Sequence, residues 1–272
     1  MLYKEMKNYN MLSNTFAHAS CSTEWKIPKN LKWDFFSYKN SISVYIDKDV
    51  EKGIKDKNDG KKKFLWLLES RQFDGGAKNY IIKNLNLVLE CFEQIWTCDY
   101  ELLLLNEKFK WCPAYGTYVK DIFVRNKTKK ISMITSNKTM TEQHKFRYNF
   151  AISNQNCLDL YGRGFKEIKI KEEGLDDYMF SVCIENDTYD TYFTEKILDC
   201  FATGVIPIFK GTRKIVEHFD SDGIIFLDDF EIKNINQEIY DQKKIAIQKN
   251  NELVRQFDIL DDWIFDKYLV YF

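Results

Sequence analysis

The chain has 272 residues, of which 44% are hydrophobic and 16% aromatic, so it can bury one large core or two modest ones. Forty basic against 41 acidic residues give a formal net charge of −1, which excludes a bulk electrostatic attraction to nucleic acid. No run reaches about 18 consecutive apolar residues, and the N-terminal stretch MLYKEMKNYNMLSN has no apolar core of signal-peptide length. We therefore expect no membrane span and no secretory signal.

The first half alternates short apolar runs with helix-like segments. Residues 1–40 are aromatic and irregular, and residues 48–63 are a charged loop or short exposed helix. The continuous apolar run at 64–68 (FLWLL) is typical of a parallel strand buried on both faces, and Glu69 follows it at once. The other predicted elements of this half are a strand at 42–46, a helix at 79–92, a strand at 94–97 and a helix at 101–109.

The second half begins after a polar, basic linker at 126–130 and has the same alternation. Its predicted elements are a strand at 131–135, a helix at 141–153, strands at 158–161 and 179–184, a helix from Glu195 to Gly204 and a strand at 205–209. Strands that alternate with helices in both halves predict an α/β protein with parallel sheets, built as two facing Rossmann-like domains.

Seven cysteines lie at positions 21, 91, 98, 112, 157, 183 and 200, an odd number with no CxxC spacing. Several stand in apolar runs, as Cys183 does between Val182 and Ile184. This usage is typical of reduced, buried thiols in a reducing compartment.

The stretch 178–211 is the most informative part of the chain. Its buried strand ends in a polar loop, and Thr194 precedes Glu195 and Lys196 on the first turn of the following helix. A helix N-terminus at the carboxyl end of a parallel strand offers unpaired N–H groups to a diphosphate. A lysine there adds a point charge for phosphate, and a carboxylate can accept hydrogen bonds from ribose hydroxyls. The alternative is an ordinary αβ unit with a solvated Glu-Lys pair.

This stretch resembles the donor-site signature of family 10 glycosyltransferases, the α1,3/4-fucosyltransferases. The matching positions are Glu185-Asn186, residues 192–196 (YFTEK) and residues 206–211 (IPIFKG). Ile184 stands where the family has Phe, and Phe193 where it has Val or Ile, and both are apolar exchanges. The resemblance implies the two-domain GT-B arrangement, with the nucleotide held by the second domain.

The resemblance also implies roles for the residues of this stretch. Asn186 and Tyr192, with Glu185 in the same motif, position the donor, Glu195 bonds the ribose and Lys196 supports the diphosphate. From the residues alone, Asn186 could cap the loop and Tyr192 could pack in the core.

Two further positions extend the resemblance. Ser136-Asn137 followed by Arg147 resembles the family's Ser-Asn strand end and the arginine that contacts the diphosphate, and the planar fork of an arginine suits phosphate oxygens. A solvated helix arginine is the alternative. His144 and Lys145, one turn earlier, could add to the same cluster, but a surface position is favoured for each. Gly162 lies in a Tyr-Gly-x-Gly turn like the family's, where glycine lets the backbone approach a ligand.

Transfer with inversion needs a base for the acceptor hydroxyl, and Glu69 is our candidate. The family has its proposed base after an apolar strand of the first half, and Glu69 corresponds loosely. The alternative is a strand-end carboxylate bonded to local N–H groups or paired with Arg71. His18 and Arg71 are candidates for acceptor binding. Aromatic residues that could stack on a sugar, but that could equally be core, are Trp25, Trp33, Phe35 and Phe36.

We expect no metal and no cofactor. Asp220-Ser221-Asp222 has the Asp-x-Asp form that another glycosyltransferase class uses for metal, but here it precedes an apolar run, so a turn into a strand is predicted. The resembled family is metal-independent.

The sequence therefore predicts an inverting, metal-independent glycosyltransferase that moves L-fucose from GDP-fucose to a hydroxyl of a glycan acceptor. Alternatives are another donor of the UDP-xylose or UDP-galactose type, or a non-catalytic glycan-binding module. The expected domains are 1–127 on the acceptor side, 128–250 for the nucleotide sugar, and a C-terminal helix in 251–272 that packs back on the first domain. We expect a location in the cytosol of a bacterium or of a virus-infected host cell. Nothing in the sequence indicates an oligomeric state.

Overall fold

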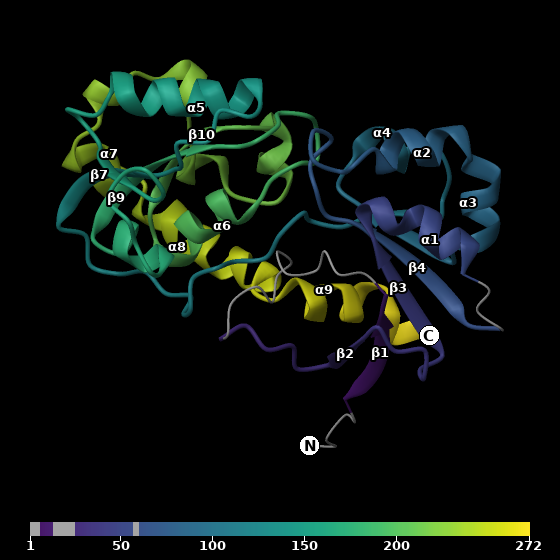
Figure 1. Cartoon of the computed structure of the whole chain (residues 1–272). Coiled ribbons are helices and arrows are strands. Elements are labelled where there is room, and N and C mark those ends of the chain that lie inside the picture. Colours follow the sequence, from purple (N-terminus) through teal and green to yellow (C-terminus); the bar gives the residue numbers. More distant parts are fainter. Residues whose placement is uncertain (1–5, 13–24, 57–59) are drawn as a thin grey trace. The chain divides into compact units, whose positions relative to one another are not determined.

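The computed structural model describes residues 6–12, 25–56 and 60–272, which fold as two compact units (Figure 1). Unit 1 takes the chain up to Gly116 together with Ile259–Phe272, and unit 2 is Thr117–Asp258. Each unit is an α/β sandwich around a parallel sheet, as the alternation of strands and helices predicts.

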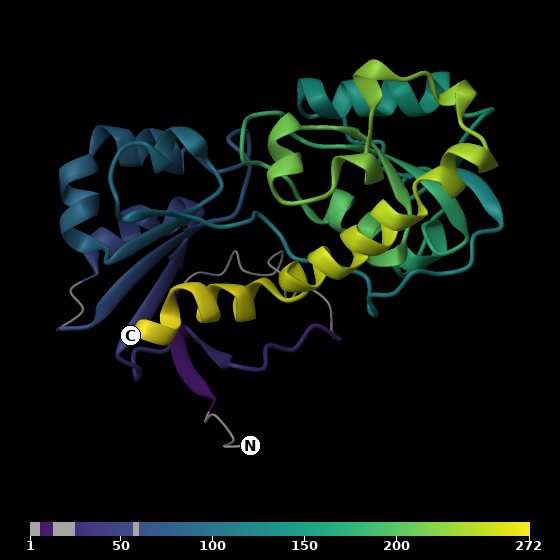
Figure 2. The ribbon, with the colours of Figure 1, turned by 180° about the vertical axis from the view of Figure 1, so that it is seen from behind.

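Unit 1 contains a six-stranded parallel sheet in the order β2-β1-β3-β4-β5-β6. The strands are β1 (Lys7–Met11), β2 (Leu31–Phe35), β3 (Ile42–Ile46), β4 (Lys62–Leu67), β5 (Gln94–Thr97) and β6 (Phe109–Trp111). The helices are α1 (Val50–Lys55), α2 (Ala77–Lys83), α3 (Leu85–Cys91), α4 (Tyr100–Leu103) and, from the C-terminus, α9 (Leu260–Lys267). Figure 2 shows α9 in yellow, beside strands of this unit.

Three sequence-based assignments in unit 1 are wrong. The region before residue 40, expected to be irregular, contains β1 and β2. The alternation of apolar and polar residues does not reveal β1, because the polar residue Asn10 is buried and bonded to Ser43 and Asn40. The helix expected at 79–92 is broken at Asn84, whose side chain bonds the Tyr80 carbonyl. The helix expected at 101–109 ends at Leu103. Phe109 is instead the buried first residue of strand β6.

Unit 2 contains a five-stranded parallel sheet in the order β11-β10-β9-β7-β8. The strands are β7 (Lys129–Ile134), β8 (Asp159–Tyr161), β9 (Tyr178–Ile184), β10 (Ile206–Lys210) and β11 (Ile225–Phe226). The helices are α5 (Glu142–Ser153), α6 (Glu195–Thr203), α7 (Gln237–Gln242) and α8 (Lys244–Leu253). Helix α5 covers one face of the sheet, and α6 and α8 lie on the other (Figures 1 and 2).

The division between the units falls at different residues from the expected 127/128 and 250/251. Residues 117–127 lie with unit 2 because Tyr118 N–H donates to Asp199 (2.7 Å) and Arg125 N–H to the Thr203 carbonyl (3.4 Å). Residues 251–258 also stay there, since the Asn251 side chain bonds the carbonyls of Phe201 and Ala202 at the end of α6. The segment from Ile259 belongs to unit 1, where Trp33 Nε1 donates to Asp261 at 2.6 Å.

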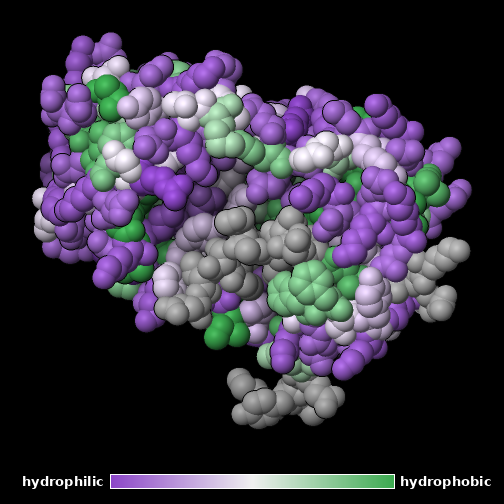
Figure 3. Space-filling model, viewed as in Figure 1, coloured by the Kyte–Doolittle hydropathy of each residue, from purple (hydrophilic) through white to green (hydrophobic). Residues whose placement is uncertain are grey.

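The surface and the thiols follow the composition. In the face shown in Figure 3, hydrophilic side chains predominate and apolar ones form small separate patches. None of the helices within the described ranges has the length and apolar character needed to span a bilayer. The six described cysteines are free, and Cys183 and Cys200 are buried with their sulfurs 3.2 Å apart.

Candidate functional site

The carboxyl ends of β7 and β9 in unit 2 carry the residues that the sequence singled out for the donor. Thr194 is the N-cap of α6, and its Oγ1 accepts the N–H of Lys196 (3.3 Å). Glu185, the first residue after β9, is fully buried and accepts both the N–H and the hydroxyl of Thr194, at 2.9 and 2.7 Å. A buried carboxylate therefore fixes the turn on which the helix begins.

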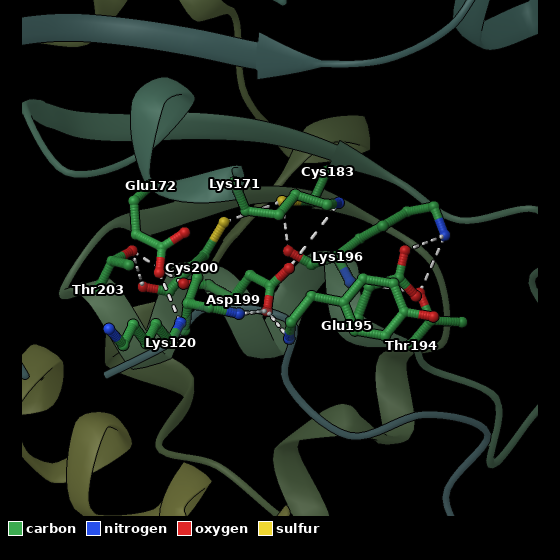
Figure 4. A network of polar contacts seen from close by, with 12 residues as sticks. Lys120, Lys171, Glu172, Cys183, Thr194, Glu195, Lys196, Asp199, Cys200 and Thr203 are labelled. Carbon is green, nitrogen blue, oxygen red and sulfur yellow. Dashed lines mark hydrogen bonds and ion pairs between the residues drawn. The ribbon is translucent and has the colours of Figure 1, made fainter. Parts of the chain in front are cut away.

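Figure 4 shows the Lys196 ammonium beside Thr194 and Glu195. Its Nζ lies 3.0 Å from Thr194 Oγ1 and 3.4 Å from a carboxylate oxygen of each of Glu185 and Glu195. Burial pulls the pKa of Lys196 down, but the two carboxylates outweigh burial and raise this pKa above its ordinary value. Burial acts upward on the pKa of Glu195, yet Lys196 and Lys171 hold this pKa below its ordinary value. Both side chains are therefore charged at neutral pH.

Arg147 joins the same cluster from α5. Its side chain is buried, and Nη1 donates to Asn186 Oδ1 at 2.8 Å and to the Ile184 carbonyl at 3.4 Å. Burial lowers the pKa of Arg147, while Glu185 and Glu195 oppose this shift. Within the described part of the chain, the buried Nε group of Arg147 has no hydrogen-bond partner. A buried guanidinium N–H without a partner suits an anionic ligand.

His144, for which the sequence favoured a surface position over a place in the Arg147 cluster, is buried one turn before Arg147. Burial and the positive charges of Arg147, Lys138 and Lys196 lower its pKa to about 4, so the imidazole is neutral at pH 7. The i, i+3 spacing from Arg147 is the sequence signal for the alternative that His144 joins this cluster. Arg147, Lys138 and Lys196 therefore all act on the same buried position of α5.

Tyr192 and Gly162, which were also predicted to serve the donor, have a packing role and a backbone role in the structure. Tyr192 is buried, with its ring centroid 4.9 Å from that of Tyr189, so the ring packs in the unit. Gly162 has a φ of +104°, and a Cβ there would lie 2.1 Å from the Thr135 carbonyl oxygen. Only glycine fits where β7 and β8 end side by side. The roles of both residues toward a donor stay predictions.

Glu69 and Arg71 lie in unit 1, directly after β4. The N–H groups of Leu68 and Glu69 donate to Asp47 Oδ1, at 2.8 and 3.3 Å. Arg71 forms a two-point ion pair with Asp99, at 2.7 Å for each contact, so its guanidinium stabilises this loop. The base role of Glu69 and the acceptor role of Arg71 stay predictions, and His18 lies outside the described residues.

The Asp-x-Asp sequence forms the predicted turn. Asp220 Oδ1 accepts the N–H of Asp222 at 3.0 Å, its other oxygen pairs with Lys249, and β11 follows. Across the ranges that the structure describes, no group of three or more His, Cys, Asp or Glu side chains has a metal-binding arrangement.

Comparison with known proteins finds one family and one fold. Residues 124–257 match the family model for glycosyltransferase family 10 (fucosyltransferase), C-terminal region. An α-(1,3)-fucosyltransferase of Helicobacter pylori is 34% identical over 83 residues, which are 30% of this chain and 17% of that relative. The chain therefore matches less than a fifth of the length of this curated relative.

Three solved structures, all of α1,3-fucosyltransferase, resemble the whole chain or nearly all of it. One without a named ligand has a TM-score of 0.55 at 14% identity, and the match covers 100% of this chain and 90% of the fucosyltransferase chain. A complex with GDP has a TM-score of 0.53 at 15% identity, with coverages of 100% and 91%. A complex with GDP-fucose has a TM-score of 0.50 at 15% identity, with coverages of 93% and 82%. At these identities the likeness shows the fold, and the predicted class of two Rossmann-like domains of the GT-B type is confirmed.

Proposed function

We propose that the protein transfers L-fucose from GDP-fucose to a hydroxyl of a glycan acceptor, because residues 124–257 match the family model for glycosyltransferase family 10. One observation carries the proposal. Arg147 and Lys196, which come from different helices, share a single cluster around Glu185 and Asn186 at the carboxyl edge of one sheet. Ligands of open parallel α/β sheets bind at that edge.

The cluster suits a nucleoside diphosphate. Arg147 and Lys196 are balanced by the carboxylates Glu185 and Glu195, and Lys138 and the neutral His144 lie within the same field. A diphosphate adds negative charge where Arg147 has an unpaired donor, and Lys196 offers further N–H groups. Glu195, on the first turn of α6, then accepts hydrogen bonds from ribose hydroxyls. Asn186 keeps the guanidinium in place through its 2.8 Å bond.

Glu69 supplies the base in the proposed reaction. The acceptor oxygen attacks the anomeric carbon while its proton passes to the Glu69 carboxylate, and the bond from that carbon to the diphosphate oxygen breaks. GDP leaves with the bonding electrons, and Arg147 and Lys196 stabilise the negative charge that develops on it. Attack from the side opposite the leaving group inverts the anomeric configuration. The positive side chains of Arg147 and Lys196 stabilise the leaving diphosphate, as a metal ion does in the glycosyltransferase class with the Asp-x-Asp motif. The proposed transfer therefore needs no metal.

Thermal unfolding in the presence of GDP, UDP, CMP and their sugar conjugates tests the donor. At a nucleotide concentration of about 100 Kd, mass action predicts a rise of about 5 °C or more in the Tm with GDP and GDP-fucose. A response to UDP compounds alone would replace the donor by a UDP-sugar. A response to no nucleotide would leave only a glycan-binding module.

Release of GDP from GDP-fucose tests the transfer, first with water and then with a panel of free oligosaccharides as acceptors. We expect the panel to contain a sugar that accelerates release. The Glu69→Gln variant should lose the release while its affinity for GDP stays nearly intact. Wild-type rates in this variant would eliminate Glu69 as the base.

A further inference from the structure

Asp47 holds the piece of backbone that carries the predicted base. It follows the last residue of β3, and β3 pairs with β4, whose end leads into Glu69. Asp47 Oδ1 accepts the N–H of Leu68 at 2.8 Å and the N–H of Glu69 at 3.3 Å. One carboxylate oxygen therefore fixes the direction in which the chain leaves β4, and with it the starting point of the Glu69 side chain.

The backbone conformation and the burial of Asp47 are both unfavourable for an aspartate. Its φ is +46°, a left-handed conformation that few residues other than glycine adopt, and its side chain is only 5% exposed. Among the described residues it has no cationic partner, so a buried carboxylate depends on two N–H groups alone. Glycine would take the same φ without strain. Strained, buried polar residues of this kind gather at functional sites.

Asp47 is also coupled electrostatically to Glu69. Burial raises the pKa of Asp47 to about 7, the N–H groups of Leu68 and Glu69 oppose this, and the charges of Glu69 and Asp74 add to it. The repulsion between two carboxylates is mutual. Above about pH 7, where Asp47 is ionised, its charge therefore favours the uptake of a proton by Glu69, which is the task of a general base.

Most of the other charged groups around this point have hydrogen-bond or ion-pair partners of their own. Arg71 and Lys78, from the loop after β4 and from α2, form ion pairs with Asp99 and Glu101. The carboxylate of Asp74 accepts the N–H groups of Gly76 and Lys78 at the start of α2. The remaining charged residues of the neighbouring turn and of α1 are Lys48, Asp49, Glu51, Lys52 and Lys55. Glu51 pairs with Lys55, and Lys52 donates to the Leu12 carbonyl.

We propose that Asp47 is a positioning residue for the catalytic base: it fixes the backbone of Glu69 and, by its negative charge, makes Glu69 a stronger proton acceptor. The inference rests on the proposed function, in which Glu69 takes the acceptor proton. Asp47 contacts no substrate in this account, so its effect reaches the reaction only through Glu69.

The test is the steady-state rate and the pH profile of Asp47→Asn, measured as GDP release from GDP-fucose. Asparagine keeps an oxygen for the two N–H groups and tolerates a left-handed φ, but it removes the charge. At pH 8, where Asp47 is ionised, we expect a kcat about tenfold lower and a KM for GDP-fucose within about twofold of wild type. At pH 6, where the Asp47 carboxyl is mostly protonated, the difference in kcat from wild type should shrink. Asp262→Asn is the matched control, because Asp262 likewise accepts two successive N–H groups, from Lys29 and Asn30, in the same unit.

A wild-type kcat for Asp47→Asn at pH 8, equal to that of Asp262→Asn, would overturn the proposal. Glu69→Gln measured beside them separates the two claims. If Glu69→Gln is inactive while Asp47→Asn is normal, only the role of Asp47 fails. If Glu69→Gln keeps its activity, the base assignment fails first. Should Asp47→Asn not fold, Asp47→Gly takes its place: loss of kcat with unchanged KM supports the proposal, and an unchanged profile overturns it.

Discussion

Asp199 makes the stability of unit 2 depend on pH. It lies on α6, one turn after Glu195, and is 1% exposed. Its Oδ1 accepts the N–H groups of Tyr118 and Val119, and Oδ2 lies 3.8 Å from Lys171 Nζ (Figure 4). Burial raises the pKa of Asp199 from 3.8 to about 7, against the opposing effect of Lys171. The substitution to examine is Asp199→Asn, which keeps an acceptor for Tyr118.

The sign and the size of the effect follow from linkage. The native state binds the Asp199 proton more tightly than the unfolded chain, so the free energy of unfolding falls as pH rises from about 4 to about 7. A shift of about three units corresponds to about 4 kcal/mol. This contribution is fully present below pH 4, lost above pH 7, and absent at every pH in Asp199→Asn.

Urea unfolding at pH 5 and pH 8 measures the difference. From pH 5 to pH 8, the loss of stability should be smaller in Asp199→Asn than in wild type by about 3 kcal/mol, the part of the shift that lies above pH 5. Asp228→Asn, an exposed carboxylate in the same unit, controls for the exchange itself. An equal loss in wild type and Asp199→Asn would refute the reasoning from burial.

Other expected outcomes concern the donor cluster, the framework of unit 2 and the metal. Lys196→Ala should weaken GDP binding about tenfold or more in a calorimetric titration, whereas Lys129→Ala, at the opposite end of β7, should not. Lys127→Met should cost about 3 kcal/mol in urea unfolding, because its ammonium donates to the carbonyls of Leu175, Asp176 and Thr203. Excess EDTA should leave GDP release unchanged, and loss restored by a divalent cation would contradict the metal-free proposal.

Much of unit 2 could be predicted because its local signals agree with one another. The strand at 179–184, the Thr194 cap, the helix from Glu195 and the glycine at 204 all fall where the structure has them. Apolar periodicity, a capping hydroxyl and a left-handed glycine point to the same element.

The misses share a different cause, since they depend on partners distant in sequence. Asn10 is polar yet buried, because Asn40 and Ser43 satisfy its side chain, and this concealed β1. His144 was expected at the surface because the sequence does not show which side of α5 packs against the sheet, and the structure buries it. Asp47 belongs to no sequence motif, because its contact is with the backbone at the end of the neighbouring strand, β4.

A calorimetric titration of the protein with GDP measures whether Arg147 and Lys196 bind one diphosphate together. We predict saturable binding of GDP that weakens about tenfold or more in both Arg147→Ala and Lys196→Ala, because both cations hold one diphosphate. Tight GDP binding that survives either substitution, or the absence of any binding to wild type, would contradict the account.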